Sequence, residues 1–529
     1  MLLALMWLST LANRPLFNPD EGRYAEIPRE MFQGGDWVIP HLDGLAYIEK
    51  PPLQFWATAF MYRVFGVSEL SARLYTALCA LGTVAWVWIL GVKIGGREMG
   101  WRCAAVISGM LMLTALGQLL SLDMSLTFYM TASLAGFLLA QQGGPTQRRW
   151  MLLAWMAAAL GVLTKGLIAA AIPTVVLGLY SLWSRDVSPW RKLHWQLGLP
   201  LFLGLVVPWH WRAALRLSDF LQFYFVREHF ARYLTPIADR AEPWWFFGWV
   251  FLAGTLPWTV SALRVLGSGW RARRDSGQFN PSLFLWIWVI FILVFFSLSD
   301  SKLMPYILPL MPALALLIGT QPTPALKRDF FFTAVLTTVA GLALIVVSLN
   351  WAAMIASSDR SANFLPLAKP LTLVAVLLTA TGIFVWVQGV RNVTRAGVFL
   401  GVGWCLSWLL LIRAAALLAP IYSGVALAAA LPAADRDAPL YSVRTYDQSL
   451  TFYLQRTVTL VGYRGELDYG LRRMPSAEIA DLDEFIRLWG GQTRAYAVMD
   501  KRTFDNLKAR GVPMVLAGAN VERVLVARQ

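Results

Sequence analysis

The sequence predicts a polytopic α-helical membrane protein that ends in a small α/β domain. Of its 529 residues, 57% are hydrophobic and only 15% are charged, and the mean hydropathy is +0.54. This composition is too apolar for a soluble globular protein. Up to about residue 419 the apolar residues form runs of the length that crosses a bilayer, about 20 residues. Residues 420–529 instead alternate between strand-like and helix-like patterns, which is typical of an α/β domain.

Thirteen apolar segments are candidates for membrane-spanning helices. They are residues 1–12 (partial), 73–92, 103–120, 124–141, 150–163, 166–184, 196–214, 244–263, 281–299, 303–319, 330–350, 369–388 and 396–419. The pair 150–163 and 166–184 could also be one long span that bends at Lys165. Residues 1–12 lack the basic region and cleavage site of a signal peptide. They are also short for a full span, so either the native start lies upstream of Met1 or this helix begins abruptly.

The charges of the connecting loops test this division. Every second loop is short and basic, for example at Arg148 and Arg149, and the positive-inside rule makes these loops cytoplasmic. The loops between them are acidic or mixed and fall outside. The alternation holds over all thirteen spans, which favours a break at Lys165. It leaves the N-terminus inside and the C-terminus outside.

Two outer segments are large. Residues 13–72 are too long for a tight turn and contain two amphipathic helical stretches, at about 20–33 and 52–65, which we expect along the membrane interface. In the C-terminal segment, strand patterns occur at 438–445, 457–462, 494–500 and 521–528. Helix patterns occur at 447–455, 476–490 and 501–511. No catalytic constellation is visible in this segment.

Several function classes are excluded by composition and by missing motifs. The net charge of +15 is spread over many loops and forms no single basic face, so we expect no nucleic-acid partner. There is no Walker loop, no dinucleotide-binding glycine fingerprint and no HExxH motif, so a nucleotide-dependent machine is not expected. The three cysteines lie in apolar segments and are interpreted as packing residues.

The stretch "NPDEGRYAEIPRE" at 18–30 allows a structural and a catalytic interpretation. Asn18 can be an N-cap, Pro19 suits the first helical position, and Glu21 lies where a capping box places a carboxylate. Asp20 would lie favourably at the positive end of the helix dipole. A catalytic role for Asp20 therefore competes with a purely local one.

Ionisable residues at the outer ends of the predicted spans all fall on one side of the membrane. Asp123 interrupts an otherwise apolar run, and Lys165 has no partner among its neighbours, although it could simply extend to the interface. Charged residues at membrane depth are costly and are functional candidates. The set also includes residues that could be solvated pairs or faces: Asp20, Glu21, Arg23, Glu49, Lys50, Arg227, Glu228, His229, Arg232, Asp300 and Lys302, with Tyr306 just inside.

Taken together, this set suits a phosphate-bearing lipid substrate. Lysine and arginine bind phosphate as a point charge or as a bidentate fork. Carboxylates together with a histidine can hold a divalent metal ion or a sugar. A transporter would instead place its ionisable groups near the middle of the membrane on broken helices, and the clustering at one face argues against it.

Six motifs carry a family resemblance. In order they are "NPDEGRYAEIPREM", "DWVIPHLDGLAYIEKPPLQFW", "LSLDMSLTF", "LTKG", "EHFARY" and "SDSKLMPYILP". With this series, from residue 13 to about 310, the chain resembles the bacterial 4-amino-4-deoxy-L-arabinose lipid A transferases. These are GT-C glycosyltransferases related to protein O-mannosyltransferases. The resemblance extends to the plan of thirteen spans followed by an α/β domain.

The resemblance implies an activity and a location. The donor would be a sugar on undecaprenyl phosphate, the acceptor a phosphate of lipid A, and the configuration at the anomeric carbon would invert. The reaction would take place on the periplasmic face of the bacterial inner membrane, among membrane lipids, and would give resistance to cationic peptides such as polymyxin. Transfer of another polyprenyl-linked sugar, or transfer to a protein or glycan, is the main alternative.

The resemblance also implies residue roles. Asp20 and Asp123 match the family's acidic positions, and Lys50 matches the ligand of the donor phosphate. Glu49 and His229 match its metal site, for zinc or for magnesium or manganese. No nucleotide takes part, because the lipid phosphate is the leaving group. Further residues expected to bind substrate or phosphate are Lys165, Arg232, Lys302 and Tyr306.

Overall fold

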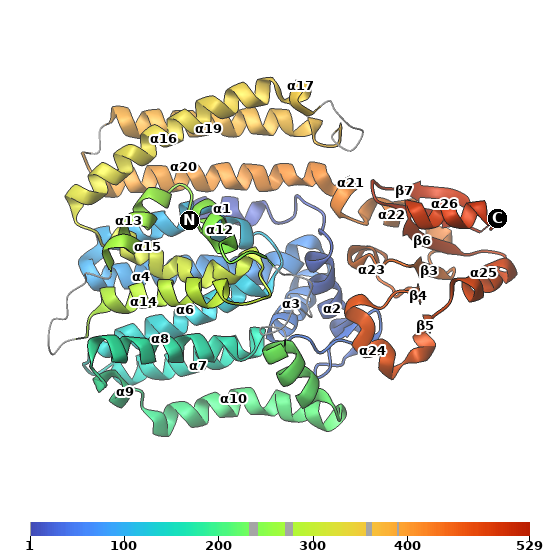
Figure 1. The fold of residues 1–529 in the computed structure, drawn as a ribbon, viewed down its shortest axis with the longest axis horizontal. Helices are drawn as coiled ribbons and strands as arrows, with labels where there is room; N and C mark the ends of the chain where they lie inside the picture. The colour runs from blue at the N-terminus through green and yellow to red at the C-terminus, as the bar shows by residue number, and fades with distance from the viewer. Residues whose placement is uncertain (1, 232–241, 270–278, 356–361, 389–390, 529) are drawn as a thin grey trace.

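The structure is a computed structural model that describes residues 2–231, 242–269, 279–355, 362–388 and 391–528, the side chains of Leu2 and of residues 229–231 excepted. Most helices run side by side in one large helix bundle, and a smaller domain with a β-sheet extends from one end of it (Figure 1). The order of a helical part followed by an α/β part agrees with the predicted fold class.

Helix occurs in each of the thirteen segments that the sequence predicts to span the membrane. The bundle contains α1 (Leu2–Ser9), α4 (Glu69–Gly109), α5 (Leu111–Leu116), α6 (Leu122–Gln141), α7 (Gln147–Lys165), α8 (Ile168–Ser184), α9 (Ser188–Arg191), α10 (Trp195–Arg216), α12 (Phe246–Gly254), α13 (Thr259–Gly269), α14 (Pro281–Ser297), η3 (Met304–Leu310), α15 (Met311–Gly319), α16 (Thr323–Leu349), α19 (Ala368–Val387) and α20 (Val393–Ala414). The predicted span 73–92 and the start of the span 103–120 lie within α4, where non-helical backbone at Gly95 and Gly96 separates them, and the second span continues into α5.

Within the described ranges, five helical stretches are long and apolar enough to cross a bilayer. They are Glu69–Gly109, Leu122–Gln141, Thr323–Leu349, Leu365–Val387 and Val393–Tyr422. Other apolar helices are shorter, and the number of thirteen spans stays a prediction. The expected break at Lys165 is confirmed as a break between helices, because α7 ends at this residue and Gly166 has a φ of 86°.

The first large loop contains the two amphipathic helices that the sequence predicts. They are α2 (Asp20–Gly34) and α3 (Leu53–Phe65), separated by a hairpin of β1 (His41–Leu42) and β2 (Leu45–Ala46). Their apolar faces are buried against the C-terminal domain, as the Tyr62 and Phe452 rings show, with centroids 6.4 Å apart. This contact fixes α2 and α3 between the helix bundle and the sheet.

The start of α2 differs from the capping arrangement expected from the sequence. Pro19, and not Asn18, is the N-cap residue, and no side chain caps the helix. The Asn18 side chain is instead used by the C-terminal domain: its amide donates to Asp447 at 2.8 Å, and its oxygen accepts from the Ser449 N–H at 2.8 Å. Asn18 does not cap α2 because Asp447 and Ser449 of the C-terminal domain bind its side chain instead.

The C-terminal domain is built on a six-stranded sheet in the order β5-β4-β3-β6-β8-β7. The strands β3 (Leu440–Val443), β4 (Thr459–Val461), β5 (Glu478–Ile479) and β6 (Tyr496–Asp500) are parallel, and β7 (Val515–Ala519) and β8 (Arg523–Ala527) form an antiparallel edge. The helices include α23 (Gln448–Leu454), α24 (Asp468–Arg473), α25 (Leu482–Gly491) and α26 (Lys501–Ala509).

The predicted strands and helices of this domain are largely confirmed, with two differences. The sequence predicts one helix over 476–490, but its start forms a turn and the short edge strand β5, and α25 begins only at Leu482. β5 forms a strand because it pairs with β4, since edge pairing can override a local helical pattern. Strand β7 is missing from the prediction because "VLAGA" is small and glycine-containing, and it forms by pairing with β8.

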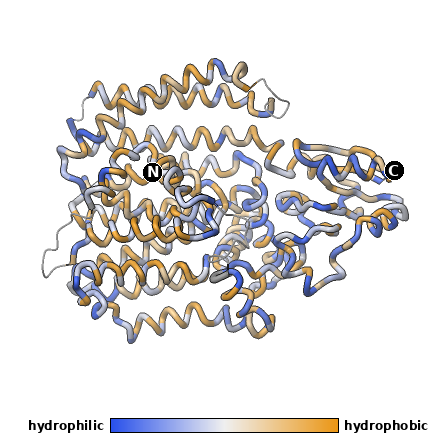
Figure 2. The backbone as a smooth tube through the Cα atoms, in the orientation of Figure 1, coloured by the Kyte–Doolittle hydropathy of each residue, from blue (hydrophilic) through white to orange (hydrophobic). Residues whose placement is uncertain are grey.

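The hydropathy of the two parts differs visibly. Hydrophobic residues run along the helices of the bundle, whereas the C-terminal domain mixes both kinds (Figure 2). The loops around α2 and α3 lie at the end of the bundle that faces the C-terminal domain, and α9, in a basic loop, lies at the far end (Figure 1). The loop that carries Asp20, Glu49 and Lys50 thus has the C-terminal domain as its neighbour.

Candidate functional site

Tyr24 on α2 lies near three of the predicted carboxylates. Its side chain is buried, and its pKa is raised first by burial and then by the negative charges of nearby acids. These acids are Asp20, Glu49 and Asp123, which come from three separate segments of the chain. The structure therefore brings together, around one phenol, three acids that the sequence singled out. We call this group the carboxylate cluster.

Asp20 is the solvent-exposed member of the carboxylate cluster. It is the first residue of α2, and 60% of its side chain is exposed. Its only ion pair among the described residues is a long one, 3.9 Å to Arg23 one turn later. A carboxylate at the positive end of a helix that keeps most of its oxygen surface free can receive a substrate group.

Asp123 is paired with a lysine that the sequence could not connect to it. Lys165, the last residue of α7, forms an ion pair with Asp123 in the first turn of α6, 42 positions away. The lysine ammonium also lies 4.9 Å from the centroid of the Tyr306 ring, a cation–π contact. Both charged side chains stay partly exposed, 18% for Lys165 and 14% for Asp123. Three predicted site residues are thus in direct contact.

Lys50 directly follows Glu49 of the carboxylate cluster in the chain. Its ammonium donates to the Glu49 carbonyl at 3.0 Å and lies 3.4 Å from the Glu228 carboxylate. The Glu49 carboxylate accepts from the Tyr47 hydroxyl at 3.3 Å. Pro51 and Pro52 follow Lys50 and restrict the backbone before α3 begins. The backbone therefore holds Lys50 and Glu49 in a defined position.

Glu21 is not part of this site, although it neighbours Asp20 in sequence. Its carboxylate accepts from Arg73 at 2.8 and 3.0 Å and from Arg14 at 2.9 Å, and only 4% of the side chain is exposed. Burial alone would raise the pKa of Glu21, but Arg73 and Arg14 outweigh it and hold the pKa well below its ordinary value. The predicted capping box is wrong, because these arginines use the carboxylate instead.

Of the remaining predicted residues, the structure describes the side chain of Lys302, which makes no hydrogen bond or ion pair with the described residues of this site. Lys302 is buried and donates to the Ser299 carbonyl at 2.5 Å, within its own loop. Arg232 lies outside the described residues, and so does the side chain of His229. Their predicted roles are therefore not tested by this structure.

The described side chains do not by themselves make up a metal centre. In the ranges that the structure describes, no three His, Cys, Asp or Glu side chains gather closely enough to hold an ion. Glu49 reaches the site but faces Tyr47, and the Glu228 carboxylate is engaged by Lys50.

Sequence reasoning missed Tyr24 and Tyr47 as members of the site. Both lie in the family motifs, but their sequence neighbours give no signal that Tyr47 binds Glu49 or that Tyr24 lies near three acids. The sequence marks Glu228 only as a charged residue of an outer loop and predicts no particular role for it. It lies on η1 (Gln222–Ala231), a π-helical stretch, and such stretches are frequent at functional sites.

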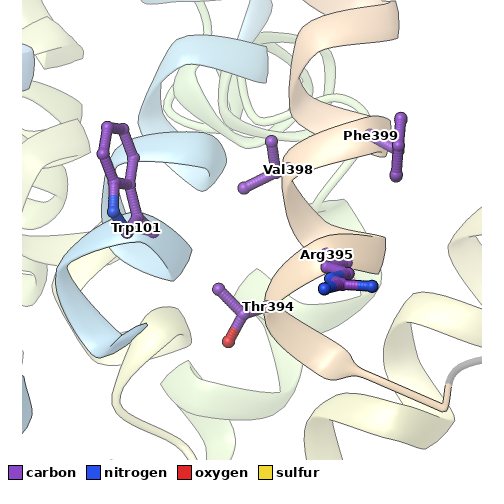
Figure 3. A pocket seen from close by; sticks show the side chains of 5 residues that line it. All are labelled: Trp101, Thr394, Arg395, Val398 and Phe399. Atoms are coloured by element: carbon purple, nitrogen blue, oxygen red, sulfur yellow. The ribbon is translucent and has the colours of Figure 1, made fainter. Parts of the chain in front are cut away.

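A cavity of about 430 Å³ lies elsewhere, between α4 and the start of α20. It is lined by Trp101, Thr394, Arg395, Val398 and Phe399 (Figure 3). These residues flank loops that the charge pattern predicts to be cytoplasmic, so this cavity is separate from the carboxylate cluster.

Two family models match the chain. Residues 427–528 match the aminoarabinose transferase C-terminal domain, and residues 4–224 match the dolichyl-phosphate-mannose-protein mannosyltransferase model. The first part of the helix bundle, with Asp20, Lys50, Asp123 and Lys165, thus matches one transferase family, and the sheet domain matches another.

Relatives and solved structures extend the comparison. An undecaprenyl phosphate-alpha-4-amino-4-deoxy-L-arabinose arabinosyl transferase of Aeromonas salmonicida (strain A449) is 33% identical over 350 residues, 65% of this chain and 63% of the relative. A protein of the same name from Pseudomonas aeruginosa (strain UCBPP-PA14) is 34% identical over 327 residues, 60% of this chain and 57% of the relative. These matches span less than two thirds of each relative's length.

The similarity to one solved crystal structure extends over nearly the whole length of both chains. The crystal structure of ArnT from Cupriavidus metallidurans bound to undecaprenyl phosphate has a TM-score of 0.91 and 31% identity, over 100% of this chain and 97% of that one. The fold, the carboxylate cluster at one end of the bundle and these matches place the chain in the GT-C class of membrane-embedded glycosyltransferases. Within this class, the chain belongs to the aminoarabinose transferase family.

Proposed function

We propose that this chain transfers 4-amino-4-deoxy-L-arabinose from undecaprenyl phosphate to a phosphate group of lipid A. The observation that carries this proposal is the full-length likeness to an ArnT structure that holds undecaprenyl phosphate. The relatives' names support the sugar and the carrier. The grouping of three carboxylates with Lys50 and Lys165 supports a substrate that carries both a sugar and phosphates.

The reaction is a direct displacement at the anomeric carbon. An oxygen of the lipid A phosphate forms the new bond, the bond from that carbon to the undecaprenyl phosphate oxygen breaks, and the electron pair leaves with undecaprenyl phosphate. The configuration inverts. A phosphate monoester has its second pKa near 6, so it is largely dianionic at neutral pH. It needs little help from a general base, unlike a serine or threonine hydroxyl.

The protein's main task is therefore to stabilise the negative charges of the two phosphates and the positive charge that develops on the sugar. Two phosphates approach each other, and Lys50 neutralises the leaving one while Lys165 adds positive charge at the neighbouring edge. The anomeric carbon becomes positive in an oxocarbenium-like transition state, which a nearby carboxylate favours. Asp20 has the exposed oxygens for that role and for holding the ammonium of the sugar. Arg232, Lys302 and Tyr306 keep their proposed roles in binding phosphate or substrate.

A divalent cation, zinc or magnesium or manganese, is a separate part of the proposal. Glu49 and the imidazole of His229 would hold it, and it would supply extra positive charge for phosphate. The test is transfer by protein freed of metal with a chelator, with each ion then added back singly. Full activity of the metal-free protein would reject this part and leave the displacement intact.

The proposed location is the bacterial inner membrane, with the site on the periplasmic face. The alternation of basic and mixed loops supports this orientation. The site lies on the side that carries the C-terminal domain, and both would then be periplasmic. No nucleotide is needed at that face, because the lipid phosphate is itself the leaving group.

The deciding experiment is mass spectrometry of lipid A from cells that express the wild-type chain, no chain, or the Lys50→Ala variant. We expect the mass of a pentosamine to be added only with the wild type, and at least a hundredfold less product from Lys50→Ala. Lys93→Ala is the matched control, since Lys93 is exposed and far from the site in the sequence-predicted topology. Normal modification by Lys50→Ala would contradict the role of Lys50. Transfer to a peptide and not to lipid A would favour the alternative acceptor.

A further inference from the structure

The C-terminal domain contacts α2 directly where the substrate site begins. At Gly22, a Cβ atom would lie 2.5 Å from the Ser449 backbone nitrogen and 2.7 Å from the Gln448 carbonyl carbon. Only glycine lets the start of α23 come this close. The bonds from Asn18 to Asp447 and Ser449 secure the same contact. The domain is thus fixed against the turn of α2 that carries Asp20.

Arg23, on the next position of this turn, has an incomplete set of partners. It is 8% exposed, and its Nε–H has no hydrogen-bond partner among the residues that the structure describes. Its Nη2 atom is 3.6 Å from Glu466 and 3.9 Å from Asp20. A buried guanidinium N–H without an acceptor is costly and calls for a missing partner. The guanidinium therefore has hydrogen-bonding capacity left for an anionic oxygen.

Glu466 is a carboxylate of the C-terminal domain that is itself held in place. It lies in the 3₁₀ turn η7 (Gly465–Leu467), and one oxygen is bound by the Gln448 side chain. The other oxygen accepts from the Tyr463 hydroxyl at 2.9 Å. Burial alone would raise the pKa of Glu466, but Arg23 and Gln448 outweigh it, so the pKa is lowered and the group stays charged at neutral pH. Glu466 is a fixed negative partner for Arg23.

Arg23 and the two lysines are held by different parts of the chain. Lys50 pairs with Glu228 and Lys165 with Asp123, whereas Arg23 pairs with Glu466 of the C-terminal domain. The proposed reaction uses the two lysines on the side of the leaving phosphate, so Arg23 is the cation that we assign to the acceptor phosphate. The planar guanidinium fork fits a phosphate monoester.

We propose that Glu466 of the C-terminal domain is a positioning residue for the transfer, holding Arg23 so that its free N–H groups bind the acceptor phosphate. This inference rests on the proposed function and assigns the C-terminal domain a part in acceptor binding. Glu466 acts through Arg23 and touches no reacting atom. Loss of its charge leaves Arg23 less firmly oriented and weakens acceptor binding, while the donor side is untouched.

The test measures transfer by purified full-length protein with lipid A varied at saturating donor, and then with the donor varied at saturating lipid A. For Glu466→Gln we expect a KM for lipid A about tenfold higher, with the KM for the donor changed less than twofold. Glu466→Asp should recover part of the loss. Glu478→Gln is the matched control in the same domain, because Glu478 pairs with the exposed Arg464 at 3.3 Å and contacts no site residue among the described ones. It should leave both values unchanged.

A second variant covers the case in which Glu466→Gln does not fold. Tyr463→Phe removes only one hydrogen bond to Glu466 and should raise the KM for lipid A about two- to threefold. An unchanged KM for lipid A in the folded variants, or an equal rise for both substrates, would overturn the inference. If the wild type itself transfers nothing between these substrates, the proposed function fails instead, so the two failures can be told apart.

Discussion

Asp20 and Glu21 are neighbours at the start of α2, yet their surroundings are opposite. The Glu21 carboxylate accepts from two arginines and also from the backbone N–H groups of Phe17 and Leu120, each at 3.1 Å. The side chain of Asp20 is 60% exposed and has one long ion pair, with Arg23. The two acids share a helix end and a charge, and differ in how completely their oxygens are used.

This difference separates a structural acid from a functional one. A buried charge is tolerated only when its hydrogen bonds are complete, and once they are complete it has none left for a substrate. A functional acid must keep oxygens available and therefore stays incompletely paired. Lys165 and Asp123 are intermediate, because they are paired with each other but remain partly exposed.

The largest effect is expected from Glu21. Replacing it by glutamine leaves Arg14 and Arg73 buried without their shared anion, and breaking such a group costs about 3–5 kcal/mol. We expect Glu21→Gln to lower the melting temperature in detergent strongly and to reduce the yield of folded protein. Thermal unfolding followed by tryptophan fluorescence measures it. A melting temperature equal to that of the wild type would remove the distinction between the two acids.

A smaller effect is expected from Gly22, which tests the contact between α2 and the C-terminal domain. A methyl group here meets backbone atoms at 2.5 to 2.9 Å, and overpacking of this kind costs about 1–3 kcal/mol. Gly22→Ala should lower the melting temperature and expose the domain to limited proteolysis. Gly34→Ala on the same helix is the control, because a Cβ at Gly34 meets nothing within 4 Å. Equal behaviour of the two variants would contradict the tight contact.

The smallest effect is a dependence of stability on pH at the same domain contact. Burial, followed by the charge of Glu26, raises the pKa of Glu30 to about 8 and that of Asp43 to about 7. Asp43 also accepts from the Val458 N–H of the C-terminal domain at 2.8 Å. Both pKa values are raised on folding, so the protonated forms stabilise the fold. That stability is complete below the ordinary carboxyl pKa and is lost as pH rises through about 7 to 8.

The measurement is the melting temperature between pH 5.5 and pH 8.5, which should fall as pH rises. Glu30→Gln should flatten this dependence, because it removes the group with the higher pKa. A melting temperature that rises with pH, or a slope unchanged in Glu30→Gln, would show that these carboxyls do not act as described.

Much of the fold could be predicted because its signals are local. Apolar runs predicted the helical segments of the bundle, loop charges favoured the break at Lys165, and amphipathic patterns predicted α2 and α3. The strands β5 and β7 could not be predicted, since they depend on pairing with β4 and β8 and carry weak patterns of their own. The predicted cap at Asn18 is wrong because the Asn18 side chain donates a hydrogen bond to Asp447, more than 400 positions away.

The site could be predicted as a set of residues but not as a set of contacts. Asp20, Lys50, Asp123 and Lys165 were recognisable because they are charges at the ends of apolar segments or within unusual motifs. The pairing of Lys165 with Asp123 and of Lys50 with Glu228 comes from helix packing, which no local pattern encodes. Glu466 was out of reach for the same reason, because its domain contains no visible catalytic constellation and acquires its role only by contact with α2.

The most direct test of the account is the transfer rate of Asp20→Asn, measured with purified protein, the undecaprenyl-phosphate-linked sugar and lipid A. Asparagine keeps the size of Asp20 and the start of the helix but removes the charge. We expect a melting temperature within about 2 °C of the wild type, since an exposed pair contributes at most about 1 kcal/mol, and a transfer rate at least a hundredfold lower. A folded Asp20→Asn protein that transfers the sugar at the wild-type rate would contradict the central claim.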